Sequence, residues 1–542
     1  MQRLGLGRAL GDWSGVNMLW GASRSGRSTA VRATSTQGAT SSASSSATAH
    51  APRVVVLGGG FGGLYAAVRL DQLMWPKGKK PQVTLVDQSE RFVFKPLLYE
   101  LIGGTATAEE VAPPFAQLLA PYPVRFVQAQ VSSVETTAPG GASTSAPDEP
   151  PAAGHVMLSD GSSLPYDYLL VALGSQPDSR GVPGVRQWAV PFNSDEDALR
   201  VKGSLDLLAD SGAAGTVVVV GGGYAGVELA AVLGERCRQR GGNVSVRLVT
   251  PGAEIMEGCP PGQREAANKA LADLGVRLET GTRVVEVRGP EPADASAPDA
   301  TQMPTACTLV LTTAPLAAAL SEAEESLLPA DLVVWTAGSS PATKEARRGF
   351  PFPTDDRGAV LTEPSLRVRG SERVFALGDV AVARTEGPGH HPQLPATAQV
   401  AFQQADYAAW NMWAAINGRP LLPFRYQHLG SMMSLGQTNA AVALPVPVPA
   451  PLADAVTQSP LGPLLSLAGV RLGSSAPASA AGPAAAVGAD SGVTVEGPLA
   501  AILRRGAYLY RQPTNEQRLS VAASWLKQGL EAAASLAGGR PQ

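Results

Sequence analysis

The sequence contains little cysteine, and none of it is arranged for redox or metal chemistry. Cys237, Cys259 and Cys307 stand apart, with no CxxC pair and no histidine at ligand spacing. This argues against a disulfide scaffold, a zinc site and a dithiol redox centre, and we expect no metal. Long apolar runs are missing too, because no stretch reaches the about 18 residues of a transmembrane helix. Any membrane contact is therefore expected to be peripheral.

Strong charge of one sign is also absent from the chain as a whole. The 542 residues carry a net charge of −3 and no long basic run, so no nucleic-acid partner is expected. Residues 1–50 differ, with five arginines, one aspartate and many Ser, Thr and Ala residues. This composition is typical of an organelle transit peptide and lacks the apolar core of a secretory signal; a disordered tail is the alternative. Because this segment contributes +4, the rest of the chain carries −7.

Two segments repeat one pattern of apolar strand, glycine turn and helix. They are RVVVLGGGFGGLYAAVRL at 53–70 and TVVVVGGGYAGVELAAVLGERC at 216–237. A second apolar strand follows each, PQVTLVDQ in the first case and VSVRLVTPG in the other. The repeat predicts an α/β fold with two Rossmann-like dinucleotide-binding domains.

The glycines of each turn have the GxGxxG spacing of a pyrophosphate site. The first glycine permits the tight turn, the second lets the backbone approach the phosphates, and the third lets the helix pack closely on the strand. Asp87 ends the strand that follows the first turn, where an acid can bind a ribose hydroxyl. A purely structural turn is the alternative. The glycines concerned are Gly58, Gly60 and Gly63 in the first unit and Gly221, Gly223 and Gly226 in the second.

The second unit has Thr250 where the first has its acid. An acid at this position favours the free 2′-hydroxyl of NAD and repels the 2′-phosphate of NADP, so its absence predicts that NADPH is tolerated. Two dinucleotide sites in one chain are economically explained by hydride transfer from a nicotinamide to a flavin. We expect FAD in the first unit and NADH or NADPH in the second.

The remaining segments set the expected domain boundaries. We place the FAD-binding domain at 51–180 and 356–436 and the NAD(P)H-binding domain at 181–355. Three Ala, Pro, Gly and Ser-rich stretches, at about 137–154, 288–306 and 441–497, are expected to be loops or disordered inserts without chemistry. Residues 498–542 are expected to form amphipathic helices, at 499–511 and 518–536.

The order of motifs resembles the type II NAD(P)H:quinone dehydrogenases of the two-dinucleotide flavoprotein superfamily. It runs through ERFVFKPLLYE, VALGSQP, GGGYAGVE, VWTAGSSP, FALGDV and AQVAFQQAD, and covers residues 53–436 before resuming near the C-terminus. The amino-acid sequences of these motifs are most similar to those of the plastid C-type branch of plants and algae. This resemblance implies reduction of a prenylquinone such as plastoquinone, ubiquinone or a phylloquinone precursor, without proton pumping. It also implies a plastid location, with a mitochondrion left open.

The resemblance assigns roles to individual residues. Gly378 and Asp379 match the family pair that approaches the flavin pyrophosphate and ribityl chain, and Ala398 begins the AQxAxQ segment that admits the flavin ring. Gln399 and Gln403, four residues apart on one expected helix face, match the glutamines of the quinone pocket. Gln404, turned away from them, is the expected control. The resemblance also places Ala337, Gly338 and Glu228 in the NAD(P)H-binding site.

Lys95 falls in the segment that approaches the flavin ring in the family. We hypothesise a Lys95–Glu228 pair beside flavin N5, where a positive charge favours reduced flavin. An ordinary surface ion pair is the alternative.

Three further expectations concern partners and competing functions. The arginines of the C-terminal helices, among them Arg504 and Arg505, are expected to lie beside apolar residues on a membrane or lipid-droplet surface, with a packing arm or homodimer contact as the alternative. A sulfide:quinone reductase needs cysteines at the flavin, which this chain does not offer there. A redox-sensing or scaffolding flavoprotein with little quinone turnover remains an open alternative.

Overall fold

The fold was analysed in a computed structural model of the chain. The structure describes residues 50–136, 152–241, 243–290, 307–312, 325–344, 349–382, 394–446, 448, 450–472 and 492–537. The predicted transit peptide and most of the first two predicted inserts lie outside these ranges.

A five-stranded parallel sheet forms the first dinucleotide-binding unit. Its strand order is β19-β7-β1-β2-β3, so a late strand joins a sheet built from the start of the chain. Runs of Val and Leu make the central strands β1 and β7 apolar on both faces, as strands buried in a parallel sheet require. The bounds are β1 Arg53–Leu57, β2 Gln82–Asp87, β3 Val124–Gln128, β7 Tyr168–Val171 and β19 Val374–Ala376.

The second unit repeats this design. Its parallel sheet has the order β12-β11-β10-β16-β9. One large apolar cluster includes Val54 of β1 and Val217 of β10, so the two units share a core. The bounds are β9 Val190–Pro191, β10 Gly215–Val220, β11 Val244–Val249, β12 Arg277–Glu279 and β16 Leu332–Trp335.

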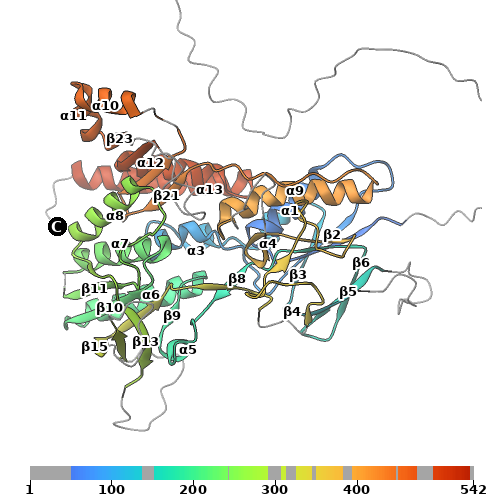
Figure 1. Cartoon of the computed structure of the whole chain (residues 1–542), viewed down its shortest axis with the longest axis horizontal. Coiled ribbons are helices and arrows are strands. Elements are labelled where there is room, and N and C mark those ends of the chain that lie inside the picture. The colour runs from blue at the N-terminus through green and yellow to red at the C-terminus, as the bar shows by residue number, and fades with distance from the viewer. Residues whose placement is uncertain are drawn as a thin grey trace, which may run out of the picture. The chain divides into compact units, whose positions relative to one another are not determined.

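Helices follow each glycine turn and cover the sheets (Figure 1). In the first unit, α1 and α9 pack side by side, and α9 carries the AQVAFQQAD motif. In the second unit α7 follows the glycine turn. The helices of the two units are α1 Phe61–Gln72, α2 Leu98–Gly103, α3 Ala108–Val111, α4 Phe115–Leu119, α5 Val185–Trp188, α6 Asp195–Asp210, α7 Tyr224–Gln239, α8 Pro261–Asp273 and α9 Ala398–Ile416.

Short strands connect the two units. Strands β8 and β17 pair antiparallel, and they follow the apolar strands β7 and β16 in the chain. Two antiparallel three-stranded sheets, β4-β5-β6 and β13-β14-β15, flank the units. Their bounds are β4 Val131–Thr136, β5 Gly154–Leu158, β6 Ser163–Tyr166, β8 Ser175–Pro177, β13 Arg283–Arg288, β14 Cys307–Thr312, β15 Glu325–Ala330 and β17 Ser339–Pro341; the parallel pair β18 Val360–Leu361 and β20 Ala381–Val382 adjoins them.

The prediction that 441–497 is an unstructured insert is wrong for its described part. Strand β22, which starts at Ala440, pairs with β21 and β24, and β23 completes an antiparallel sheet. Alternating Ala and Val residues make β22 a buried strand despite the low complexity of its surroundings. The elements are β21 Ser431–Ser434, β22 Ala440–Leu444, α10 Ala450–Gln458, α11 Leu461–Leu467, β23 Val470–Leu472 and β24 Val493–Gly497.

Two C-terminal helices follow this sheet, α12 Pro498–Tyr510 and α13 Asn515–Ala537, close to the predicted bounds. Among the described helices, none has both the length and the apolar character to cross a membrane. Within the same residues, no cluster of three or more His, Cys, Asp and Glu side chains is placed to hold a metal ion.

Candidate functional site

The first glycine turn connects β1 to α1. Its backbone is tightly packed except at Gly60, where a ligand could approach it. Gly58 has a φ of +95°, and a methyl group there would lie 2.4 Å from the carbonyl oxygen of Ala172. A methyl group at Gly63 would lie 1.8 Å from the Gly58 carbonyl oxygen, so only glycine lets α1 pack this close to the turn. At Gly60, apart from its chain neighbours, no atom of the described residues lies within 4 Å of an added methyl carbon. The open place at the helix N-terminus suits an approaching phosphate.

The second turn, between β10 and α7, has nearly the same geometry. Gly221 has a φ of +121°, and a methyl group at Gly226 would again lie 1.8 Å from the preceding turn carbonyl. At Gly223, as at Gly60, the part of the chain that the structure describes has no atom within 4 Å of the added carbon except in the neighbouring residues. Neither α1 nor α7 has a side-chain N-cap, so its first N–H groups remain available to an anion.

The strand ends beside the two turns differ as the sequence indicated. Asp87 ends β2, and its Oδ2 accepts a hydrogen bond of 2.6 Å from the main-chain N–H of Gly59. Burial raises the pKa of Asp87, although the N–H groups of Gly59 and Ser89 favour the charged form. Thr250 occupies the corresponding place after β11, is buried, and packs against Gly222. The second site therefore has a neutral side chain where the first has a carboxylate.

The segment after β16 borders the second glycine turn. A methyl group at Gly221 would lie 2.6 Å from Thr336 Oγ1 and 3.0 Å from the Ala337 nitrogen, so these residues touch the turn. Gly338 has a φ of +105° and is covered by the Arg180 side chain. The structure thus brings Ala337 to the second glycine turn, whereas the contact found for Gly338, the next residue, is with Arg180.

The Gly-Asp turn follows β19 and meets the start of α9. Gly378 has a φ of +73°, and its N–H donates to Gln404 Oε1 at 2.7 Å. Ser175 donates to Asp379 Oδ2 at 2.8 Å, which orients that carboxylate. Ala398 is the first residue of α9, so small side chains lie at the helix end nearest this turn. Gln404 is fully buried, and its role in holding Gly378 makes it unsuitable as the neutral control expected from the sequence.

Gln399 and Gln403 share one helix face, and their amides are already hydrogen-bonded. Gln399 donates to the Gly430 carbonyl at 3.0 Å and accepts from the Leu429 N–H at 3.1 Å. Gln403 donates to the Gln427 carbonyl at 2.8 Å and accepts from its N–H at 3.0 Å. These bonds hold the segment after α9 along the helix. The spacing of the two glutamines does not predict this structural role.

The predicted Lys95–Glu228 pair does not form. Lys95 Nζ donates to Asn193 Oδ1 at 2.7 Å, while Glu228 Oε1 accepts from the Ser434 N–H at 2.7 Å. Burial lowers the pKa of Lys95, and the negative charges of Asp379 and Asp197 partly offset this effect. Lys95 is therefore near the Gly-Asp turn, whereas Glu228 belongs to a different polar group. The pairing failed because each head group finds a nearer partner that no local motif reveals.

Glu228 lies on α7, buried among charged and hydroxyl groups. Burial raises its pKa to about 7, although the Ser434 N–H, the Arg504 guanidinium and the Tyr99 hydroxyl favour the charged form. The carboxylate of Glu100 acts in the same direction as burial. The side chain can therefore exchange a proton near neutral pH.

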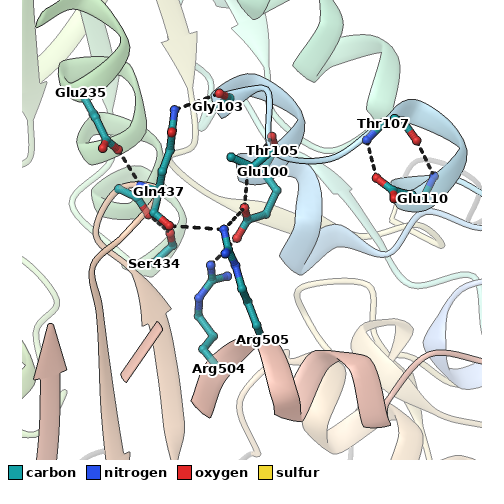
Figure 2. A network of polar contacts seen from close by, with 11 residues as sticks. Glu100, Gly103, Thr105, Thr107, Glu110, Glu235, Ser434, Gln437, Arg504 and Arg505 are labelled. Atoms are coloured by element: carbon teal, nitrogen blue, oxygen red, sulfur yellow. Dashed lines mark hydrogen bonds and ion pairs between the residues drawn. The ribbon is translucent and has the colours of Figure 1, made fainter. Parts of the chain in front are cut away.

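Arg504 reaches this group from α12 and is fully buried (Figure 2). It forms an ion pair with Glu100, whose second oxygen lies 3.3 Å from Arg505 Nη2. Burial favours neutral Glu100, but Arg504 and Arg505 hold its pKa below the usual range. Nε and Nη1 of Arg504 find no hydrogen-bond acceptor among the described residues, and the guanidinium lies over the Tyr508 ring at 5.2 Å from its centroid. The prediction that Arg504 faces a membrane is therefore wrong.

The opposite side of α12 is exposed. The exposed positions repeat at three- and four-residue steps, as do the buried ones, so the helix is two-sided. Among the residues of α12 and α13 up to 527, the exposed large apolar side chains are Leu499, Ile502, Leu503, Tyr510, Leu519 and Leu526.

Three contributors to the site were not identified from the sequence: Ser175, Gln404 and Arg504. Ser175 lies in the VALGSQP motif, which gave a usable signal because it follows an apolar strand. Gln404 and Arg504 gave none, since a glutamine or arginine on an amphipathic helix is usually exposed. Only the packing of α9 and α12 makes them internal.

The residues present fit FAD in the first unit and NAD(P)H in the second. Each unit offers an open glycine position at an uncapped helix N-terminus, which a pyrophosphate can occupy. Asp379 adds a carboxylate oriented by Ser175, and a carboxylate accepts hydrogen bonds from ribityl hydroxyls.

Comparisons with known proteins identify the family and support FAD and NAD(P)H as its cofactors. Residues 52–405 match the family model of pyridine nucleotide-disulphide oxidoreductases. The chain is 38% identical over 480 residues to alternative NAD(P)H-ubiquinone oxidoreductase C1, chloroplastic/mitochondrial, of Arabidopsis thaliana, covering 88% of this chain and 80% of that protein. It is 36% identical over 485 residues to the demethylphylloquinone reductase NdbB of Synechocystis, covering 88% and 96%.

A solved structure shares the fold. NDH2 from Plasmodium falciparum in complex with NADH superimposes with a TM-score of 0.61 at 15% identity, covering 88% of this chain and 98% of that one. The two glycine turns, the Gly-Asp turn and these relatives lead to one conclusion. The chain belongs to the pyridine nucleotide-disulphide oxidoreductase family and, within it, to the type II NAD(P)H:quinone oxidoreductases.

Proposed function

We propose that this protein oxidises NAD(P)H and reduces a membrane prenylquinone by two electrons, without moving protons across the membrane. The observation that carries the proposal is the pair of matching open glycine turns, one of which shares its sheet with the Gly378–Asp379 turn. Bound FAD supplies the two-electron chemistry, because it can take a hydride from a nicotinamide and give electrons to a quinone.

The chain's own residues bind and orient the reactants. Gly60 would admit the FAD pyrophosphate, Asp87 a ribose hydroxyl and Asp379 the ribityl chain. Gly223 would admit the pyrophosphate of NAD(P)H in the second unit. Lys95 places a positive charge near Asp379, where it would stabilise negative charge at the flavin ring.

The quinone head group would lie at the start of α9, beside the Gly-Asp turn. Small residues such as Ala398 leave room there, and Gln399 and Gln403 hold the neighbouring segment in place. We propose that these glutamines shape the quinone site by fixing that segment. Replacing either with Glu should raise the KM for quinone more than the KM for NAD(P)H, because a charged group disturbs the main-chain contacts.

Thr250 supports the use of NADPH as well as NADH. A neutral side chain at the end of β11 does not repel a 2′-phosphate. Steady-state kinetics with both nucleotides test this point, and a strong preference for NADH would contradict it.

The exposed face of α12 and α13 would contact the lipid that contains the quinone. Its leucine, isoleucine and tyrosine side chains form an apolar surface on helices whose other side is anchored in the protein. Deleting α12 would also remove the buried Arg504–Glu100 pair, so Ile502→Ser is the cleaner test. It should weaken vesicle binding and leave the reduction of a water-soluble quinone unchanged.

An organelle is the proposed location. The Arg- and Ser-rich composition of residues 1–50 supports import, and the Arabidopsis relative is named chloroplastic/mitochondrial. We place this protein in a plastid, with prenylquinones such as plastoquinone or a phylloquinone precursor as the substrate class. Microscopy of a fluorescent fusion to residues 1–50 tests the location.

The decisive experiment is purification of the protein with its bound flavin. NADH or NADPH should bleach the flavin absorbance, and a benzoquinone or naphthoquinone should restore it rapidly. Bleaching without reoxidation by any quinone would instead favour the redox-sensing flavoprotein.

A further inference from the structure

Three tryptophans gather at the far end of α1 and α9, away from the glycine turn. The rings of Trp410 and Trp413 stack with centroids 4.8 Å apart, and Trp75 lies 6.5 Å from Trp413. All three are partly exposed, and Met74 between them is 91% exposed. Exposed apolar residues usually occur singly, so this cluster calls for an explanation. We call Met74, Trp75, Trp410 and Trp413 the tryptophan patch.

Hydrogen bonds fix the rings of the patch in place. Trp413 Nε1 donates to the Met74 carbonyl at 2.9 Å, and Trp75 Nε1 donates to the Leu70 carbonyl at 2.8 Å. Trp75 and Trp413 thus have the polar edge of the indole satisfied while part of the apolar ring surface stays in solvent. A rigid set of aromatic rings binds a surface at a low cost in conformational entropy.

Basic residues follow Trp75 in the chain and come just after α9. The segment 74–80, MWPKGKK, holds three exposed lysines and no acid, and Arg419 is exposed just beyond α9. Lys80 pairs with Asp71 at 2.6 Å. The chain as a whole has a net charge of −3, so this local excess of positive charge contrasts with the net negative charge of the protein. Tryptophan beside lysine is the composition found at the headgroup level of membranes.

The tryptophan patch lies on the face of α9 that also contacts the end of α12. Phe402, Asp406, Trp410 and Trp413 follow one another at four-, four- and three-residue steps on α9. Arg511, at the end of α12, lies over the Phe402 ring at 4.0 Å from its centroid. The patch therefore lies on the same side of α9, about 16 Å further along the helix.

We infer that the tryptophan patch, with Lys77 and Lys79, is a second lipid-binding surface that docks on anionic headgroups. This inference rests on the proposed function, in which the quinone lies in a membrane. One contact at α12 and α13 would leave the protein free to tilt, whereas a second contact along α9 fixes its orientation. A twofold contact between two copies is disfavoured, because it would bring the lysines of both patches together.

Binding to lipid vesicles tests the inference. The full chain with bound flavin is sedimented with vesicles of phosphatidylcholine alone and of an equal mixture with phosphatidylglycerol. Lys77→Glu with Lys79→Glu should weaken binding to the anionic vesicles at least about tenfold, since each lysine near such a surface contributes measurably. Met74→Ser with Trp410→Gln should weaken binding to both kinds of vesicle.

The matched control lies in the second unit. Leu327 is 62% exposed on β15 and Lys269 is exposed on α8, so Leu327→Ser with Lys269→Glu removes the same kinds of group elsewhere. Flavin content and the rate with a water-soluble quinone should stay unchanged in all variants. If a patch variant loses its flavin, a measurement on the unmodified protein replaces the vesicle assay of that variant. Brominated lipids should then quench tryptophan fluorescence, and an absence of quenching would overturn the inference.

The remaining outcomes separate the two claims. Unchanged vesicle binding in both patch variants would overturn the inference and leave quinone reduction in solution intact. A protein that binds vesicles through the patch but reduces no quinone would overturn the proposed function instead. A shift from dimer to monomer on Met74→Ser with Trp410→Gln, measured by light scattering, would show that the patch joins two copies and would also overturn the inference.

Discussion

The two dinucleotide-binding units have the same turn and different surroundings. In both, a methyl group on the third glycine would lie 1.8 Å from the turn carbonyl, and the second glycine is open. They differ at the strand end, with Asp87 in one and Thr250 in the other, and two residues after the third glycine, with Tyr65 and Glu228. The shared parts are those proposed to bind a pyrophosphate, and the differing parts give the two units different chemical surroundings.

Tyr65 and Glu228 also show how the C-terminal helices connect the units. The Tyr65 hydroxyl donates to the main-chain carbonyl of Arg511, and Glu228 lies near Arg504. Equivalent positions of α1 and α7 thus face the C-terminal end and the middle of the same helix, α12. This arrangement joins the first and second units through an element that also presents an exposed apolar side.

The largest effect is expected from the third glycines. Gly63→Ala and Gly226→Ala each force a methyl group against a backbone oxygen, so either should lower the free energy of unfolding by about 3 kcal/mol or more. Chemical denaturation measures the loss. If the units are distinct sites, Gly63→Ala should lose bound flavin, whereas Gly226→Ala should keep flavin and lose NAD(P)H binding. Loss of flavin in both variants would contradict this division.

Glu228→Gln should change how stability depends on pH. The folded-state pKa of Glu228, about 7, lies above its ordinary value of 4.5, so the folded protein holds a proton that the unfolded chain releases. The stability of the unmodified protein relative to the variant should therefore fall between pH 4.5 and about 7, by about 3 kcal/mol in total, and stay constant above that. Denaturation at several pH values measures this difference.

Tyr65→Phe is the matched control for Glu228→Gln. Burial raises the pKa of Tyr65, despite the opposing charges of Arg511 and Arg518, so this hydroxyl does not ionise in the same pH range. Its removal should shift stability by the same amount at every pH. A stability difference for Glu228→Gln that is equally independent of pH would refute the elevated pKa.

The open glycines should respond through ligand binding alone. Gly60→Ala and Gly223→Ala have room in the protein, so both should fold normally. The added methyl group would occupy the path of the pyrophosphate and weaken binding about tenfold or more. Gly60→Ala should reduce flavin content, and Gly223→Ala should raise the KM for NAD(P)H at unchanged flavin content. Normal binding in both variants would mean that the phosphates lie elsewhere.

The smallest effect is expected at the strand end of the second unit. Thr250→Glu restores an acid like that of the first unit and should reduce kcat/KM for NADPH relative to NADH by about tenfold, roughly 1.4 kcal/mol. Thr250→Ser is the control and should leave the ratio unchanged. Equal ratios for Glu and Ser would show that Thr250 does not contact the ribose.

Local motifs were sufficient for the two units and their cofactors. Gly58, Gly221 and their partners have φ values and close contacts that only glycine allows, so their spacing predicts the turn wherever it occurs. The expected strand end at Asp87 agrees with the structure for the same reason. The Ala and Pro content of 441–497 was misleading, because β22 gains its stability from pairing with β21 and β24 rather than from its composition.

The sequence by itself determined the glycine turns, the strands beside them and the residue types at the strand ends, because these depend on neighbours a few positions away. Tertiary structure alone decided that Arg504 pairs with Glu100, 404 residues earlier, and that Gln404 holds the Gly-Asp turn. It also brought Trp75 against Trp413. A helix pattern shows which residues share a face, but not which element covers that face. The partners of a buried charge are therefore known only once the chain has packed.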